Sequence, residues 1–531
     1  MQVTRATLAV ALTCLVAAAA LAQQPAGQEK LGQVHFTNTC SAAVQGDLNR
    51  AVALLHSFWW GATIKAFNEV ARQDPSCGIA HWGVAMAILS NPFTWPPSPK
   101  ALADGSAAVG RARAAGAQSP RELDYIAAIE VLYKDHDKVE HRTRAVAYEK
   151  AMEQLSARYP DDREAAIFYA LALNATALAT DKAYAQQLKA ASLLEAAFRE
   201  QPDHPGVAHY LIHSYDYPAI AEKGLGAARR YATIAPAAPH AQHMPSHIFT
   251  RRGYWQDSIQ SNLASAAASD NDFDRFHAWD YLAYGYLQLG QDRAARGVLD
   301  QILSVEKPDV LNFAVAFALA AIPSRYALER RQWAEATALA LRPGDFPWAR
   351  FPQAEAILVF TRGVGAARSG NLAQARDDQA RLAALRDGLL AAKIGYWADQ
   401  VDIQRLLVAG WLGWAQGRTD DALQLLRAAA DREDATEKHP VTPGAIVPAR
   451  ELLGELLLEL GRPGEALREF EASQQREPNR LRGYYGVARA AELAGDAAKA
   501  RAQYRQLVTL AEKADTERPE VAQAKAFLAK P

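Results

Sequence analysis

The spacing of large and small apolar residues predicts pairs of helices along the chain. The clearest unit runs from Trp279 to Leu299, with the pattern Trp-x2-Leu-Ala-x2-Tyr-x3-Gly-x4-Ala-x3-Leu. A pattern of this kind is typical of a repeated helical hairpin of about 34 residues. Its small residues allow the two helices to approach closely, and its large residues fill the space between hairpins. We expect Pro308 to end this unit.

The same register recurs in the C-terminal half. A glycine followed five residues later by an alanine marks each turn and second helix, at Gly370/Ala375, Gly417/Ala422, Gly461/Ala466 and Gly495/Ala500. No run has the alternating pattern of a strand. We therefore predict an all-α solenoid of the tetratricopeptide repeat (TPR) type, with about ten to eleven hairpins, each packed on its neighbours.

Two stretches interrupt the hairpins. Residues 91–99, NPFTWPPSP, carry prolines that cannot continue a helix, and we expect them to lie over one mouth of the solenoid. Residues 431–448 are polar and contain prolines, which predicts an inserted loop. The resulting division is a signal peptide (1–22), N-terminal hairpins (23–203), histidine-rich hairpins (204–308) and C-terminal hairpins (309–531).

The N-terminus has the features of a secretory signal. Arg5 precedes an apolar run from Leu8 to Leu21, and Ala20-Leu21-Ala22 matches an A-x-A cleavage site. The run is shorter than the roughly 20 residues that a membrane-spanning helix needs, although a retained anchor is the alternative. We predict cleavage after Ala22 and a periplasmic or secreted protein that is not embedded in the membrane.

Two cysteines, Cys40 and Cys77, remain after this cleavage. An even number of cysteines in an oxidising compartment predicts a disulfide across the first hairpin, and the alternative is two unrelated buried thiols.

Charge and motifs disfavour several partner classes. The 58 Lys and Arg residues nearly cancel the 59 Asp and Glu residues, so the chain lacks the strong positive field that recruits nucleic acid or anionic membranes. We also find no glycine-rich phosphate loop, and we predict no nucleotide cofactor.

Histidines concentrate in one region. Seven of the 13 lie between residues 204 and 280, namely His204, His209, His213, His240, His243, His247 and His277. His209, His243 and His277 follow one another at intervals of one TPR length. Equivalent sides of three successive hairpins therefore carry an imidazole.

Spacing within each block places these side chains on shared helix faces, because residues three and four apart are neighbours on a helix. Imidazole and carboxylate groups suit Zn, Cu, Fe or Ni. We predict a divalent-metal site, zinc or copper before iron, with the ligands His209, His213, His243, His247, His277 and Asp280. The groups expected to support or supplement these ligands are Asp216, His240 and His204.

Repeat positions place most of these histidines on the concave groove. Pro245 predicts that the helix of the HMPSH block begins near His243 or Met244, because proline is tolerated only in the first turn. Two alternatives to a metal remain: an imidazole-rich groove for an acidic or aromatic ligand, and a hydrogen-bonded network that holds the hairpins together.

Known catalytic templates are absent from the histidine blocks. HYLIH and HMPSH lack the glutamate of HExxH, and neither a Glu-x-x-His pair nor a G-x-S-x-G elbow is present. A catalytic base would have to be Asp216, Asp280 or a histidine such as His240. Whether the protein is an enzyme stays open.

Two blocks, HPGVAHYLIHSYD and HMPSHIF, resemble those of a group of secreted bacterial TPR proteins. LLHSFWW, the AHWG-to-NPF segment and the PVTPG region are similar as well. The resemblance implies the fold and export, and it implies no reaction. It also adds His56 and His81 to the histidines of interest, each of which is otherwise explained as a core residue with a hydrogen bond.

The sequence thus favours an exported TPR scaffold with a histidine-rich metal site in its concave groove, which would bind a peptide, a protein or a small ligand. The alternatives are a metalloenzyme, either hydrolase or oxidoreductase, and a protein that binds and releases the metal itself.

Overall fold

The computed structural model describes residues 29–530, and the predicted signal peptide lies outside this range. Within it every regular element is helical, and no helix there has the length and apolarity to cross a bilayer. The five glycines predicted at hairpin turns, at 290, 370, 417, 461 and 495, all have positive φ. Glycine adopts this conformation without the steric cost that other residues incur. The predicted TPR-type register is therefore confirmed.

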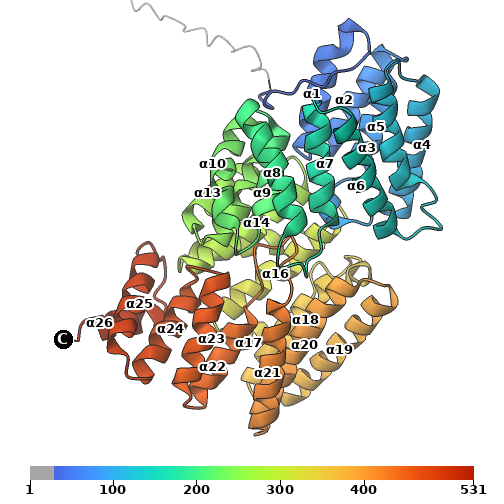
Figure 1. The fold of residues 1–531 in the computed structure, drawn as a ribbon. Helices are drawn as coiled ribbons and strands as arrows, with labels where there is room; N and C mark the ends of the chain where they lie inside the picture. Colours follow the sequence, from blue (N-terminus) through green and yellow to red (C-terminus); the bar gives the residue numbers. More distant parts are fainter. Residues whose placement is uncertain (1–28, 531) are drawn as a thin grey trace, which may run out of the picture.

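The N-terminal helices form an arc of antiparallel pairs (Figure 1). They are α1 (Gln45–His56), α2 (Trp60–Gln73), α3 (Gly78–Ile88), α4 (Pro99–Ala115), α5 (Pro120–Tyr133), α6 (His141–Arg158), α7 (Arg163–Thr176) and α8 (Ala185–Glu200). Short 3-10 turns precede α1 and α4, at η1 (Ala42–Val44) and η2 (Pro92–Thr94). A disulfide joins Cys40, before α1, to Cys77 at the start of α3.

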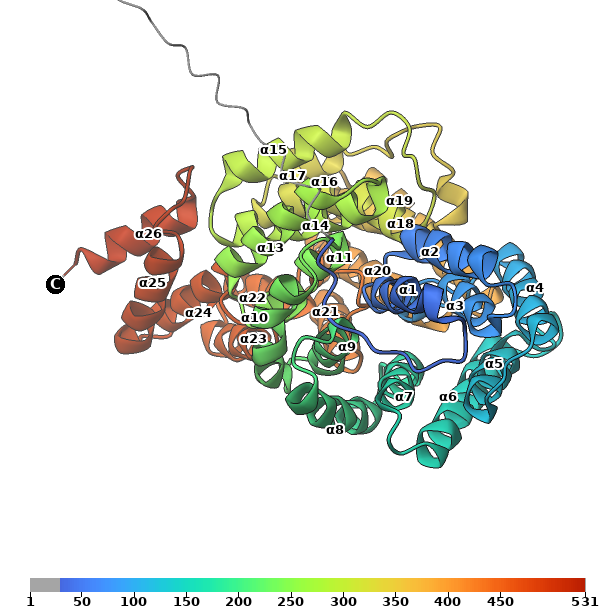
Figure 2. The same cartoon turned by 90° about the horizontal axis from the view of Figure 1, so that it is seen from above.

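The histidine-rich middle follows. It comprises α9 (Pro205–Tyr215), η3 (Ala221–Gly224), α10 (Leu225–Ile234), α11 (Pro239–His243), α12 (Pro245–Arg251), α13 (Trp255–Ala268), α14 (Asp272–Gln288) and α15 (Asp292–Leu303). The arc curves enough that α9 packs against α1, far away in sequence. In the view from above, α9 and α11 lie inside the ring of helices (Figure 2).

The helix of the HMPSH block begins earlier than the sequence predicts. It starts at Pro239 as α11 and continues as α12 after Met244, whose backbone is itself helical. Pro245 removes one N–H donor, so it interrupts the hydrogen-bond ladder without ending the helical path. As a consequence His240, which was expected outside this helix, lies in its first turn.

The C-terminal half packs beneath the first (Figure 1). Its helices are α16 (Phe313–Glu329), α17 (Trp333–Thr337), α18 (Pro352–Arg368), α19 (Leu372–Ala391), α20 (Gly395–Ala415), α21 (Thr419–Asp434), α22 (Ala449–Glu459), α23 (Pro463–Arg476), α24 (Leu481–Leu493), α25 (Ala497–Leu510) and α26 (Pro519–Leu528), with η4 (Trp348–Arg350) before α18.

The loop between α21 and α22 returns to the middle of the chain. Lys438 Nζ lies 2.8 Å from Asp216 Oδ2, and Arg325 of α16 donates to the carbonyls of Gly444 and Ala445. The stretch predicted to be an inserted loop therefore contacts the histidine-rich helices and ties the C-terminal half to them.

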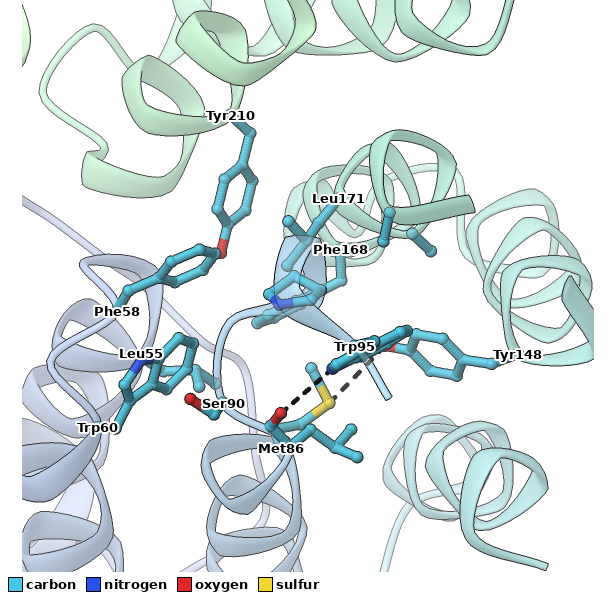
Figure 3. A pocket seen from close by; sticks show the side chains of 14 residues that line it. Leu55, Phe58, Trp60, Met86, Ser90, Trp95, Tyr148, Phe168, Leu171 and Tyr210 are labelled. Atoms are coloured by element: carbon cyan, nitrogen blue, oxygen red, sulfur yellow. Dashed lines mark hydrogen bonds between the residues drawn. The ribbon is translucent and has the colours of Figure 1, made fainter. Parts of the chain in front are cut away.

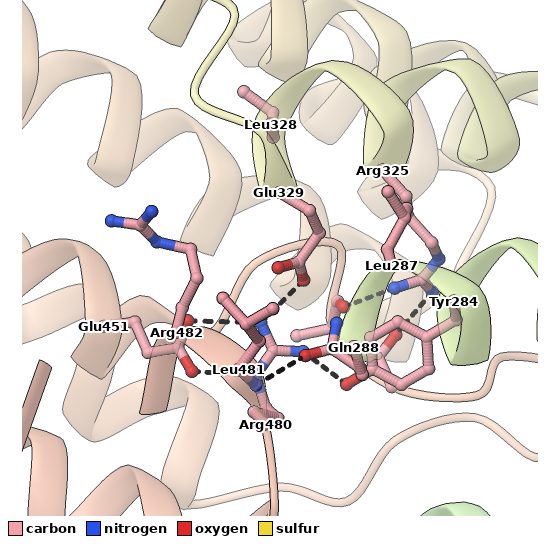
Figure 4. A network of polar contacts seen from close by, with 12 residues as sticks. Tyr284, Leu287, Gln288, Arg325, Leu328, Glu329, Glu451, Arg480, Leu481 and Arg482 are labelled. Atoms are coloured by element: carbon pink, nitrogen blue, oxygen red, sulfur yellow. Dashed lines mark hydrogen bonds and ion pairs between the residues drawn. The ribbon is translucent and has the colours of Figure 1, made fainter. Parts of the chain in front are cut away.

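A second tie is a fully buried arginine (Figure 4). Arg480, just before α24, donates to Glu451 Oε1 of α22 at 2.7 Å and to Glu329 Oε1 of α16 at 2.6 Å. It also donates to the hydroxyl of Tyr284 on α14. One guanidinium thus joins three helices and pairs with two buried carboxylates.

We expect Arg480→Met to destabilise the C-terminal half by about 3–5 kcal/mol, because it leaves Glu329 and Glu451 buried without a cation. Urea unfolding, followed by far-ultraviolet circular dichroism, measures the loss. Arg296→Met is the matched control, since it removes an arginine from an exposed pair with Asp300, and we expect little change. Equal midpoints for the two variants would contradict this role of Arg480.

Candidate metal centre

Helix α9 supplies the first two imidazoles of the site, those of His209 and His213. His204 is its N-cap, with Nδ1 accepting from the Val207 N–H at 3.3 Å, and Pro205 occupies the first turn. His209 and His213 lie one turn apart on the same face, with their Nε2 atoms separated by 3.1 Å. His240 from α11 brings its own Nε2 to 3.2 Å from that of His209. These three residues, His209, His213 and His240, are called triad A.

A second group lies beside the first. His243 ends α11 and His247 lies in α12, and their Nε2 atoms are 3.0 Å apart. His277 of α14 places its ring centroid 4.2 Å from that of His243. One nitrogen of each of these three residues falls within 4.8 Å of the others. His243, His247 and His277 are called triad B.

The spacing within each triad suits a metal ion. Zinc binds histidine nitrogen at about 2.0–2.1 Å, so tetrahedral ligands are about 3.3 Å apart. Hydrogen bonding alone satisfies such a group poorly, because two facing imidazole nitrogens share only one proton and a third nitrogen is left over. Three convergent nitrogens also leave one tetrahedral position free.

Hydrogen bonds on the far side of three rings direct the lone pairs inwards. His209 Nδ1 donates to the carbonyl of His56 at 2.6 Å, and His247 Nδ1 donates to Asp216 Oδ2 at 2.9 Å. His243 Nδ1 donates to Asn262 Oδ1 at 2.7 Å, and the Asn262 amide is oriented by its own bond to the Ser258 carbonyl. With Nδ1 protonated, Nε2 carries the lone pair that a metal needs.

The two triads form one continuous cluster. The ring centroids of His213 and His247 are 5.9 Å apart, and those of His240 and His243 are also 5.9 Å apart. The sequence predicts a single site, whereas these contacts bring together two neighbouring sets of three nitrogens. We call the six residues the six-histidine cluster.

All six imidazoles are neutral at pH 7. None is more than 6% exposed. Desolvation lowers the pKa of each below the ordinary value of 6.5, in His247 against the opposing effect of Asp216. Neutral imidazole is the form that binds metal.

Asp216 is a charged group that contacts the cluster through His247, and Lys438 and Arg251 balance its negative charge. Although desolvation opposes this, Lys438 and Arg251 hold the pKa of Asp216 well below its usual range. Its Oδ1 accepts from Arg251 Nε at 2.8 Å. Burial in turn lowers the pKa of Lys438 to about 8. Asp216 thus orients His247 without adding net negative charge.

Other residues predicted for the site lie elsewhere. Asp280 belongs to neither triad, and its Oδ1 accepts from Arg325 Nε at 3.1 Å. His204 and His56 each donate from Nε2 to Glu164, both at 2.9 Å. Because each of these protons has a carboxylate acceptor, the three residues make a satisfied network. His81 lies on α3, outside both triads.

Several functional contacts have no local signature in the sequence. His240 shares a triad with His209, and Asn262 and the His56 carbonyl accept hydrogen bonds from His243 and His209. The sequence does point to His56, because this residue lies in LLHSFWW, one of the blocks that resemble the secreted bacterial TPR proteins. Asn262, which lies in α13, has no comparable signal in the sequence.

Three covers close the cluster to solvent. Phe93, from the 91–99 loop, stacks on His213 with centroids 4.0 Å apart. Phe58, from the α1–α2 turn, lies 4.4 Å from the ring of His209. The hydroxyl of Tyr281 lies between His247 Nε2 and the Thr442 carbonyl. The imidazoles, expected along an open groove, are instead enclosed.

Comparisons with known proteins assign no function to this site. No family model matches the chain, and no curated protein matches it. Among solved structures, the human IFIT1 dimer with m7Gppp-AAAA is similar at 12% identity, covering 82% of this chain and 90% of that one, with a TM-score of 0.36. These values are too low to indicate a ligand or reaction for this chain.

We expect the metal-free protein to lose stability as the pH falls from 7 to 5. The folded-state pKa of each clustered histidine lies below 6.5, so in this window the unfolded chain binds more protons than the folded chain. The stabilisation is complete above pH 6.5 and declines below it, by about 1.4 kcal/mol per pH unit for each such imidazole. Thermal unfolding in a chelator at several pH values measures the slope.

Carboxylates contribute little in that window, because in the unfolded chain they titrate near pH 4. A midpoint that stays constant between pH 7 and pH 5 would contradict the burial of neutral imidazoles.

Proposed function

We propose that this protein is a metalloenzyme whose six-histidine cluster holds two transition-metal ions side by side, one in each triad. Copper and zinc are the ions best suited to sets of three imidazoles. The observation that carries the proposal is the convergence of one nitrogen from each of three histidines within 4.8 Å in each triad, with three Nε2 pairs at 3.0–3.2 Å. In three of the six rings the far nitrogen donates to a fixed acceptor.

A catalytic role is favoured over a structural one by the number of ligands. Structural zinc sites are closed by four protein ligands, whereas catalytic sites keep three and leave a position for water or substrate. Each triad offers three, and within residues 29–530 neither triad includes a carboxylate. When bound, the ions would supply Lewis acidity or redox chemistry at the open positions.

The helical solenoid is the frame for this centre. It brings α9, α11, α12 and α14 together and closes the cluster with loops from both halves of the chain. Binding of a peptide or protein along the groove stays a prediction of the repeat architecture and has no further support from the enclosed imidazoles.

Export of the protein is part of the proposal. It rests on the A-x-A signal ending at Ala22 and on the resemblance to secreted bacterial TPR proteins. The Cys40–Cys77 disulfide supports it, because such bonds persist in oxidising compartments.

Metal analysis of protein prepared without a histidine tag tests the central claim. After equilibration with Cu or Zn and removal of free ions, we expect two ions per chain. The double variant His243→Ala/His247→Ala, which loses two ligands of triad B, should retain one. His35→Ala changes an exposed histidine and serves as the control. Less than half an ion in the unmodified protein, or no loss in the double variant, would contradict the proposal.

An exogenous ligand distinguishes the catalytic role from the structural one. Azide added to protein loaded with Co²⁺ should change the visible absorption spectrum, since an open position accepts it. An unchanged spectrum at two bound ions per chain would indicate closed, structural sites.

We expect Asn262→Ala to weaken the affinity of one of the two ions by about 10- to 100-fold, because hydrogen bonds behind a ligand fix its tautomer and orientation. Competition with a chromophoric chelator measures both affinities. Asn271→Ala, which removes an N-cap from α14, is the control for changing an asparagine in the same region. Equal affinities in the Asn262 variant and the unmodified protein would refute the assigned role.

A further inference from the structure

A pocket opens beside the six-histidine cluster. It has a volume of about 590 Å³ and lies between the α1–α2 turn, the loop before η2, the start of α14 and the start of α16. Five aromatic side chains line it, namely Phe58, Trp59, Trp60, Phe273 and Phe313. Pockets of this size and composition are typical of small-molecule sites.

Two of these rings are shared with the metal centre. Phe58 contacts triad A, with its centroid 4.4 Å from His209 and 5.5 Å from His240. Phe273 lies one turn before His277 on α14, and its ring stacks over that imidazole at 6.2 Å. Each triad is thus separated from the pocket by a single aromatic ring.

Phe58 adopts an unfavourable backbone conformation at this position. Its φ is 54°, in the left-handed region where several turns of this solenoid use glycine, such as Gly290 and Gly461, and others use polar residues such as Asn479. A bulky residue there costs roughly 1 kcal/mol relative to glycine. Glycine would avoid this cost, but it would lack the ring of Phe58 that contacts the imidazoles and lines the pocket.

The cavity on the other side of Phe58 is too small for a substrate. It is enclosed by Leu55, Trp95 and Tyr210 among others (Figure 3). Its volume of about 30 Å³ is enough for one or two water molecules. The larger pocket is therefore the space near the metal centre that admits an organic molecule.

The rim of the larger pocket is acidic. Asp270 and Asp274 lie there with a single cation, Lys65. Carboxylates accept hydrogen bonds from hydroxyl and amino groups and repel a carboxylate substrate. Aromatic walls bind a flat ring by stacked or edge-to-face contact.

We propose that this pocket is the substrate site of the metal centre and takes a small aromatic molecule bearing a hydroxyl or amino group. The inference rests on the proposed function, since it assigns a substrate class to the same two-metal site. The ring lies against Phe58 and Phe273, and the polar substituent reaches Asp270 or Asp274.

Paramagnetic NMR with 4-methylphenol as the probe tests the assignment. The protein is loaded with Co²⁺ or with Zn²⁺, and metal content is measured first. We expect the ring protons of the probe to broaden strongly with the Co²⁺ form and only slightly with the Zn²⁺ form. 4-Methylcyclohexanol, which keeps the hydroxyl and lacks the aromatic ring, and 4-methylbenzoate, which is anionic, should broaden much less.

The two possible failures are distinct. Protein that binds no Co²⁺ overturns the proposed function. Protein with two bound Co²⁺ ions and no selective broadening of 4-methylphenol overturns the substrate assignment alone, as does equal broadening by all three probes.

A variant locates the probe. We expect Phe273→Leu to weaken 4-methylphenol binding about 5-fold, because leucine fills the space without an aromatic face. Its Co²⁺ spectrum should match that of the unmodified protein, which shows that the centre is intact. Phe198→Leu, on α8 and outside the pocket lining, should leave affinity unchanged. Equal affinities for the two variants would place the probe elsewhere and overturn the proposal.

Discussion

Six buried imidazoles whose nitrogens converge in two sets of three impose a condition on the whole molecule. A buried acceptor without a partner costs about 1–3 kcal/mol. In His209, His243 and His247 the proton is held at Nδ1 by a carbonyl, an amide or a carboxylate. Their lone pairs then meet in the buried interior of the protein. One metal ion per triad would satisfy three such nitrogens at once.

Long-range contacts maintain this arrangement. The curvature of the arc packs α1 on α9, so the His56 carbonyl meets His209 across 153 residues of sequence. From the other end, the 435–448 loop brings Lys438 to Asp216, 222 residues away. Arg480 joins α22, the helix at which that loop ends, to α16. The solenoid is thus more than a stack of neighbours, because contacts between distant hairpins enclose the cluster.

Local patterns predicted what depends on local geometry. Turn glycines gave the hairpin register, and the i, i+4 spacing placed His209 beside His213 and His243 beside His247. The division into two triads depends on the path of the chain at Pro245, where the helix continues although proline removes one hydrogen bond. That continuation carries His240 into triad A. Asp280 shows the opposite case, since its spacing suited a ligand but the buried Arg325 is its partner.

Charge decides which ions such a centre accommodates. At an effective dielectric constant of about 20, two divalent ions about 4 Å apart repel by about 17 kcal/mol, and two monovalent ions by about 4 kcal/mol. Six neutral imidazoles offset none of this, and the charge of Asp216 is already balanced by Lys438 and Arg251. Two divalent ions in such a centre would therefore need a further anion to lower their repulsion, whereas two monovalent copper ions would repel far less. The balancing charge that the protein ligands do not supply would have to come from another group. Asp270 and Asp274, which line the aromatic pocket together with Phe58 and Phe273, are acidic groups whose charge would lower the repulsion between ions held in the neighbouring triads.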